Sequence, residues 1–239
     1  MKCILVFICS ITLTLSTYLS ALAGDLAKRE IHGFSIDGGL FAFEEYGVQD
    51  GSGFPYSNIY VIDTTTDQWT AGSPFRAQLN DETKTVFDAR EEARILAGPV
   101  MKSFENRGNV VATNRATELG IDSKRIIASP RLVVRPIDDA IEFRLEEIAF
   151  AGTEICEAFG PTNGYRLLKI GTRDGDETIL LHEDTSIPES RNCPLGYDLA
   201  DLITYYPESQ SPVFAVLIRM QTVGFEGPDG RYLAVTDRF

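Results

Sequence analysis

Short runs of β-branched and aromatic residues, separated by turns rich in Gly and Asp, dominate the first part of the chain. Residues 40–43 (LFAF) follow the turn Asp37-Gly38-Gly39, and residues 58–63 (NIYVID) follow a glycine-rich loop. A polar turn then leads to Gln68-Trp69. β-branched and aromatic side chains suit a pleated, half-buried surface. The order strand, loop, strand, turn, strand therefore predicts an antiparallel meander and not a βαβ unit.

Further strands are predicted in the second half of the chain. Residues 141–146 alternate apolar and charged side chains, which is typical of a strand buried on one face. Residues 165–170 and 178–183 flank Asp174-Gly175, a pair that favours a hairpin turn. Residues 213–218 (VFAVLI) are continuously apolar, so we expect this strand to be buried on both faces.

Two other segments do not show strand periodicity. Apolar residues recur at helical spacing after Leu79: Val86, Ala89, Ala93 and Leu96. Asn80 or Asp81 is the predicted N-cap, and Gly98-Pro99 is the predicted end of this helix. We expect a helical insertion around residues 79–125 that packs on one sheet face, because a polar-backed helix of this length is marginal alone. Residues 184–211, rich in Pro, Ser, Glu and Asp, are expected to form a long surface excursion pinned by Cys193.

The first 23 residues have the pattern of a secretory signal peptide. Lys2 precedes a mostly apolar stretch, and Ala21-Leu22-Ala23 is a small-x-small cleavage site. Several Ser and Thr residues dilute the stretch, whereas a membrane-spanning helix needs about 20 predominantly apolar residues. Cleavage after Ala23 is therefore predicted, with residues 24–239 as a single β-rich domain that is periplasmic or secreted and has no membrane span.

Export also determines how the cysteines are interpreted. Cys3 and Cys9 are removed with the signal, which leaves Cys156 and Cys193. Two cysteines in an oxidising compartment predict one disulfide. Two Cys without a His at ligand spacing do not complete a zinc site, so no metal is predicted.

The charge of the chain narrows the classes of partner. The formal net charge is −13 at pH 7 and becomes one unit more negative once Lys2 is removed. So acidic a surface repels nucleic-acid phosphates and anionic lipid, and neither is an expected partner. The same charge also serves solubility.

The sequence contains none of the common catalytic motifs. Gly-x-Ser-x-Gly, His-Glu-x-x-His and the phosphate-binding Gly-x-x-x-x-Gly-Lys are all absent, and His32 and His182 are the only histidines. No catalytic residue and no cofactor are therefore predicted.

A glycine-rich loop is the candidate binding site. It contains Asp50, Ser52, Phe54 and Tyr56. Its glycines allow close backbone approach, and the two aromatic residues offer contact area at low entropic cost. The alternative is a hairpin connection whose aromatic side chains fold back onto the sheet.

The two ends of the domain share a pattern of aromatic residue, Asp-Gly and alternating strand. It occurs at residues 33–43 and again at residues 224–235. These segments resemble the strand-turn-strand elements of TolB-type β-propellers. A propeller repeats its unit about every 40–45 residues, whereas these two copies lie at opposite ends of the chain. We interpret them as two similar hairpins, placed side by side so that the termini meet.

One resemblance covers most of the chain. Residues 33–47 and 50–57, together with residues 224–232 (GFEGPDGRY), are similar to a family of predicted secreted bacterial proteins of unknown function, DUF2259. The resemblance implies export from a Gram-negative cell. It implies no activity, cofactor or catalytic residue.

These observations together define the predicted fold and function. The fold class is mainly β (α+β), an antiparallel meander or sandwich or an incomplete propeller-like scaffold, with the helical insertion. We expect a non-enzymatic protein that binds an envelope protein or another extracytoplasmic macromolecule through loops. The alternatives are a structural envelope protein and an extracytoplasmic hydrolase with a site outside the known motifs, using His182 with Glu183 or Asp184.

Overall fold

The computed structural model describes residues 24–239 apart from residues 106, 153 and 174. The predicted signal peptide lies outside the described residues. The fold is mainly β, as predicted, with three antiparallel sheets. The first outer sheet contains β1 (Lys28–Phe34), β2 (Leu40–Val48), β3 (Pro55–Asp63), β4 (Gln68–Trp69) and β5 (Phe75–Gln78). The second outer sheet contains β7 (Arg125–Ala128), β8 (Ile141–Phe150), β9 (Thr162–Gly171) and β10 (Thr178–Glu183).

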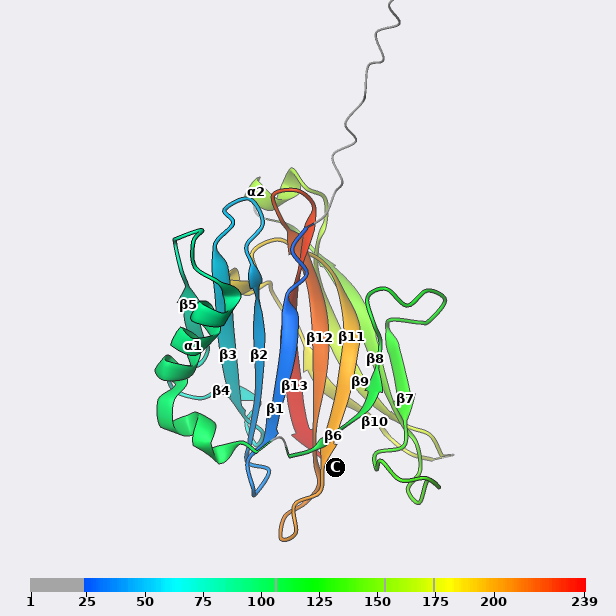
Figure 1. Cartoon of the computed structure of the whole chain (residues 1–239). Helices are drawn as coiled ribbons and strands as arrows, with labels where there is room; N and C mark the ends of the chain where they lie inside the picture. The colour runs from blue at the N-terminus through cyan, green and yellow to red at the C-terminus, as the bar shows by residue number, and fades with distance from the viewer. Residues whose placement is uncertain (1–23, 106, 153, 174) are drawn as a thin grey trace, which may run out of the picture.

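The remaining four strands form a central sheet between the two outer sheets (Figure 1). Its order is β13 (Pro228–Arg238), β12 (Val213–Val223), β11 (Pro194–Tyr205) and β6 (Asn109–Thr113). Successive side chains of a strand point to opposite faces. On β12, Ala215 and Leu217 pack in the core shared with the first outer sheet, whereas Phe214 and Val216 pack in the core shared with the second. The predicted burial of residues 213–218 on both faces is confirmed.

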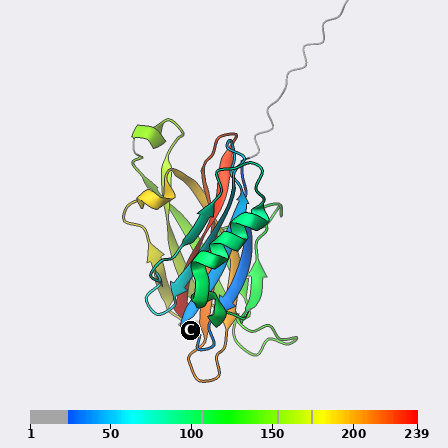
Figure 2. The same cartoon turned by 60° about the vertical axis from the view of Figure 1, so that its left-hand side comes forward.

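One helix covers the outer face of the first outer sheet (Figure 2). This helix, α1 (Val86–Ala97), continues into the 3-10 helix η1 (Gly98–Ser103). Its small buried residues, Ala89, Ala93 and Ala97, lie against the sheet. The N-cap is Thr85, which forms a capping box with Asp88, and not Asn80 or Asp81 as predicted. Leu96 is exposed.

The predicted helical insertion is shorter than expected. Only residues 86–103 of the 79–125 segment are helical, because β6 follows and pairs with β11. The predicted hairpin of residues 165–170 and 178–183 is present as β9 and β10.

The expected surface excursion over residues 184–211 is wrong. Its middle part, residues 194–205, is β11, one of the most buried strands of the molecule. The prediction failed because β11 contains two acidic residues, a residue type that usually lies at the surface. Asp198 accepts a hydrogen bond from Arg219 (2.8 Å), and Asp201 pairs with Arg29. Because each buried carboxylate has an arginine partner, the acidic residues are compatible with burial.

The segments at both ends of β1 form main-chain hydrogen bonds outside the first outer sheet. At one end, Leu26 bridges to Gly230 of β13, and at the other the Phe34 N–H donates to the Arg107 carbonyl (2.9 Å). Residues 25–27 thus lie beside Gly230 near the start of β13, whereas the C-terminus follows the other end of this strand, so the termini do not meet as expected. The Asp-Gly pair forms the β1–β2 turn in the first copy, but Asp229-Gly230 lies inside β13 in the second. No sheet closes on itself among the described residues.

The predicted disulfide between Cys156 and Cys193 is confirmed. It joins the short helix α2 (Glu154–Glu157) to the residue before β11, next to the 3-10 helix η2 (Glu189–Arg191). Among the described residues, no helix is long and apolar enough to cross a bilayer.

Candidate functional site

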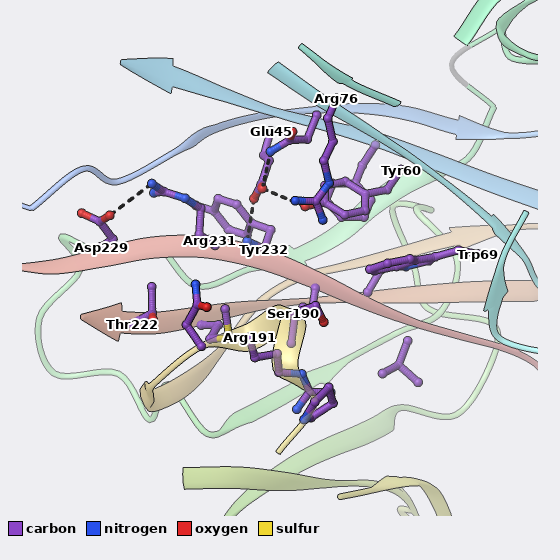
Figure 3. Close-up of a pocket in the computed structure, with 18 of the residues that line it drawn as sticks. Glu45, Tyr60, Trp69, Arg76, Ser190, Arg191, Thr222, Asp229, Arg231 and Tyr232 are labelled. Carbon is purple, nitrogen blue, oxygen red and sulfur yellow. Dashed lines mark hydrogen bonds and ion pairs between the residues drawn. The ribbon is translucent and has the colours of Figure 1, made fainter. Parts of the chain in front are cut away.

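The central sheet stops at β13, and a cavity of about 620 Å³ lies beyond this edge (Figure 3). Tyr60, Trp69 and other residues of the first outer sheet form one wall. The opposite wall comes from β9, β10 and η2, including Tyr165, His182 and Arg191. Residues 229–235 of β13 lie between the walls. The cavity therefore lies in the same layer as the central sheet, between the two outer sheets.

The edge of β13 that faces the cavity carries outward main-chain groups at alternate residues. In an antiparallel ladder, a residue directs both its N–H and its C=O to the same side. The N–H of Gly230 donates to the Asp25 carbonyl (2.8 Å), so the even-numbered residues face away from β12. The Tyr232 N–H donates to Glu45 Oε2 (2.9 Å), and the Thr236 N–H donates to Asp67 Oδ1 (2.7 Å). Two carboxylates thus stand where the carbonyl groups of a neighbouring strand would be.

Ala234 lies between these two capped positions. By the same alternation its N–H and C=O also point away from β12. No acceptor for this N–H is present among the described residues. Ala234 is half-buried and lines the cavity, so the cavity contains one open main-chain pairing position.

Glu45 reaches β13 from β2 and is only 2% exposed. It also accepts hydrogen bonds from Tyr60 OH (2.8 Å) and Asn58 Nδ2 (3.1 Å). Burial raises the pKa of Glu45, although the donors from Tyr232, Tyr60 and Asn58 oppose the shift. Its three hydrogen bonds fix the side chain, so Glu45 links the first outer sheet to the central sheet.

Asp67 reaches β13 from the turn between β3 and β4. Its φ is +53°, a conformation that Asp tolerates better than most residues. Oδ1 also accepts from Thr236 Oγ1 (2.9 Å). Burial raises the pKa of Asp67, with the two Thr236 donors opposing it. The strained turn therefore serves to bring this carboxylate to the edge.

Two of the three arginines that line the cavity are in ion pairs. Arg231 contacts Asp25 (3.0 Å) and Asp229 (3.2 Å), and Arg191 contacts Asp184 (2.6 Å). Arg76 is exposed at the rim and has no ion pair within the described part of the chain. The arginine charges of the cavity are thus largely compensated by carboxylates.

Three aromatic rings contact one another along the wall from the first outer sheet. Phe43 and Tyr60 stack with ring centroids 4.7 Å apart, and Trp69 packs against Tyr60 in a tilted arrangement at 5.8 Å. Trp69 is the only tryptophan of the chain and is 46% exposed. It offers a large apolar contact surface to a ligand.

The predicted binding-loop residues lie at different depths beside this cavity. Tyr56 is buried, lines the cavity and donates from its hydroxyl to Asp25 (2.7 Å). Ser52 donates to Gln49 (2.9 Å), which also lines the cavity. Asp50 accepts from the Glu226 N–H (2.6 Å), and Phe54 is half-buried. The loop therefore contacts the β12–β13 connection, and a binding role for it stays a prediction.

His182 lies on the cavity wall and is held by two neighbours. Its Nε2 is 3.0 Å from Asp184 Oδ1, and its ring stacks on Tyr165 with centroids 4.6 Å apart. Glu183 instead points outward and pairs with Arg166. Of the hydrolase residues proposed from sequence, the fold thus brings His182 and Asp184 together at the cavity.

His32 belongs to a separate cluster with Glu30 and Glu44, whose ligand atoms lie within 4.8 Å of one another. Arg90 occupies this cluster. It donates to Glu44 from Nε (2.8 Å) and Nη2 (2.9 Å), and it also pairs with Glu30. A cation would have to displace a guanidinium, so we do not treat the cluster as a metal centre.

Sequence reasoning did not identify Glu45, Asp67 or Trp69 as cavity residues. Each lies in or next to the predicted N-terminal meander, but no local pattern shows which side chains reach a strand almost 170 residues later in the chain. The alternation of β2 places Glu45 on the same side as Phe43, an apolar face. This was the one available signal that its carboxylate is buried.

Comparison with known proteins agrees with the sequence resemblance. The model of the DUF2259 family, described as predicted secreted proteins, matches residues 42–238. This range takes in β3, β13 and every residue that lines the cavity. No curated protein and no solved structure is significantly similar to the chain. The chain therefore belongs to DUF2259, a family of predicted secreted proteins.

Proposed function

We propose that the protein is a non-enzymatic binding protein of the periplasm or the extracellular medium, released by cleavage after Ala23. Its ligand occupies the cavity beside β13. The observation that carries this proposal is the cavity itself, about 620 Å³ in volume, with an exposed tryptophan and largely paired charges. Ligand sites are typically clefts of about 300–1,000 Å³ with aromatic walls and a few placed polar groups.

The charge of the protein argues against a nucleic acid as the ligand of the cavity. The net charge of −13 disfavours polyanions. Arg231 and Arg191 are already paired with carboxylates, which leaves Arg76 as the one cation of the lining without an ion pair among the described residues. An envelope protein segment or a cell-wall component is the partner class that fits location and charge.

Trp69 provides the test, because it is the only tryptophan and it lines the cavity. The exported protein is titrated with short peptides, oligosaccharides and peptidoglycan fragments while its fluorescence is followed. We expect a saturable change with one class. Ser190→Tyr, which fills the cavity from η2, is expected to weaken binding at least about tenfold, the equivalent of one lost contact of 1.4 kcal/mol.

Ser209→Tyr is the matched control, because Ser209 is exposed in the β11–β12 connection and does not line the cavity. It should leave the affinity unchanged. If no compound class changes Trp69 fluorescence, or if both variants weaken binding equally, the cavity is not the binding site.

The pairing of His182 with Asp184 favours a second candidate function, an extracytoplasmic hydrolase. A carboxylate that orients a histidine is the arrangement of a general base. Ser190 lines the same cavity as a candidate nucleophile. Our proposal predicts no turnover of ester, peptide or glycan substrates. Turnover that His182→Ala abolishes, while the variant keeps its fold and its ligand affinity, would establish the hydrolase instead.

A further inference from the structure

The open edge of β13 narrows the class of ligand, an inference that rests on the proposed function of the cavity. We propose that the cavity binds an extended peptide segment, which pairs with the main chain of Ala234 as an added strand of the central sheet. The partner is thus a protein with an exposed, unstructured segment. Such strand addition is a common mode of peptide recognition, in which main-chain hydrogen bonds supply affinity and side-chain pockets supply specificity.

The first argument is the distance between the two walls of the cavity. Stacked sheets pack about 10 Å apart, so two outer sheets on either side of a central sheet are about 20 Å apart. Beyond β13 this space contains no strand among the described residues, but both walls continue. The gap between them has the thickness of one sheet layer, which is the space that a single strand fills.

The second argument is that an extended segment of the chain itself already pairs with one end of this edge. The Gly230 N–H donates to the Asp25 carbonyl, and the Ala27 N–H donates to the Gly230 carbonyl (3.0 Å). This is a parallel bridge. After Ala27 the chain leaves as β1 of the first outer sheet, and the rest of the edge borders the cavity. The edge therefore accepts extended main chain and is only partly covered.

The third argument is the unused pairing position itself. Glu45 and Asp67 satisfy the N–H groups of Tyr232 and Thr236, whereas the N–H of Ala234 faces the cavity. Buried main-chain donors are nearly always paired, so a half-buried donor that faces a cavity is available to a ligand. Gly230 is already paired with residues 25–27, so the open stretch runs from Tyr232 to Thr236, four residue steps or about 13 Å. A peptide segment of about four residues therefore fits between the two carboxylates and pairs at Ala234, the middle of this stretch.

An added strand would place its side chains on both walls, because successive side chains of a strand point to opposite faces. One set would contact Tyr60 and Trp69, and the other would contact Tyr165 and His182. This predicts a ligand with a period of two in its preferred residues. A sugar lacks the alternating amides and side chains of a strand, so its binding would show no such period of two.

A random dodecapeptide library displayed on phage is the probe, with the exported protein and its disulfide intact as bait. An enriched peptide is synthesised, and its affinity is measured by Trp69 fluorescence. N-methylation of alternate peptide amides removes donors on one edge only. We expect one set of N-methyl positions to lower the affinity at least about tenfold and the other set less than about twofold, since one lost hydrogen bond is worth about tenfold.

Ala234→Pro removes the outward N–H and leaves the ladder to β12 intact, because Pro is tolerated where the N–H faces away from the partner strand. It is expected to weaken the peptide at least about tenfold. Ala234→Ser keeps the N–H and is compared with it, and it should bind the peptide at least about tenfold more tightly than Ala234→Pro does. If Ala234→Pro does not fold, as judged by circular dichroism, the N-methyl comparison decides alone.

The outcomes separate this inference from the proposed function. If an oligosaccharide or cell-wall fragment binds at Trp69 and no peptide is enriched, the proposal of peptide binding is refuted. The cavity then remains the binding site. The same holds if a peptide binds but both sets of N-methyl positions, or both Ala234 variants, behave alike. If no compound of any class binds, the proposed function itself fails.

Discussion

Replacing Glu44 with alanine is expected to lower the free energy of unfolding by about 3–5 kcal/mol, the usual cost of removing one partner from a buried ion pair. The Glu44 carboxylate is fully buried between β2 and α1. It accepts two hydrogen bonds from Arg90 and one from Ser57 Oγ (2.8 Å). Without it, the buried Ser57 hydroxyl and part of the Arg90 guanidinium lose their partner. Urea denaturation, followed by Trp69 fluorescence and circular dichroism, measures the loss.

Glu91→Ala is the matched control, since Glu91 is an exposed residue of α1 that pairs only with Arg94 (3.4 Å). Surface pairs contribute about 0–1 kcal/mol, so this variant should be nearly as stable as the wild type. Equal losses for the two variants would show that Glu44 does not anchor the helix.

The same substitution should change the acid sensitivity of the fold. Burial alone would raise the pKa of Glu44, but its contacts with Arg90, His32 and Ser57 outweigh burial and lower the pKa to about 2. The folded pKa is below the unfolded value of 4.5. The stabilisation is therefore complete above about pH 4.5 and is lost as the pH falls towards about 2.

Glu142, whose pKa is also lowered to about 2, chiefly by the hydrogen bond from Arg125, titrates in the same range. The wild type should consequently lose more stability between pH 4.5 and 2 than Glu44→Ala does, and Glu44→Ala should keep a residual slope. Parallel stability curves for the two proteins would contradict this assignment.

Removal of the disulfide is the second large effect. A double substitution, Cys156→Ser with Cys193→Ser, is expected to lower the free energy of unfolding by about 4 kcal/mol in the chain-entropy model. The bond closes a loop with a sequence separation of 37 residues. It ties α2 to the start of β11, next to η2 on the cavity wall. Denaturation curves with and without reductant measure the loss.

The controls come from the same experiment. Reductant should destabilise the wild type to about the level of the double variant and should leave the double variant unchanged. Two titratable thiols in the native, unreduced protein would contradict the bond outright.

The strands that alternate or that are wholly apolar could be predicted from the sequence, because burial leaves a direct pattern in both cases. Residues 213–218 show this most clearly, and the β9–β10 hairpin follows from its turn. β11 could not be predicted in this way. Its residues Asp198 and Asp201 are buried against Arg219 and Arg29, and these partners lie on other strands. Local composition cannot show that a carboxylate has a distant arginine.

The cavity could not be predicted from the sequence either, again for a physical reason. It exists because residues of both outer sheets extend beyond β13, the edge strand of the central sheet, and no single segment encodes that arrangement. Tyr56 was the one predicted binding residue that lines it. Glu45 and Asp67 act through contacts with residues 232 and 236 of β13, far along the chain. His182 and Asp184, in contrast, are neighbours in sequence, and their pairing could be proposed in advance.

The position of the central sheet in the chain has a consequence for how the protein folds. The first outer sheet comes from residues 28–78, but the core it shares with the central sheet needs Ile203, Val213, Ala215 and Leu217. Such contacts join residues far apart in sequence, and chains of this kind collapse slowly because long loops must close first. The inner face of the early strands therefore has no apolar surface to pack on until β11 and β12 have been synthesised. A nascent chain that stays unfolded until its last strands emerge is suited to being threaded through a membrane channel before it folds.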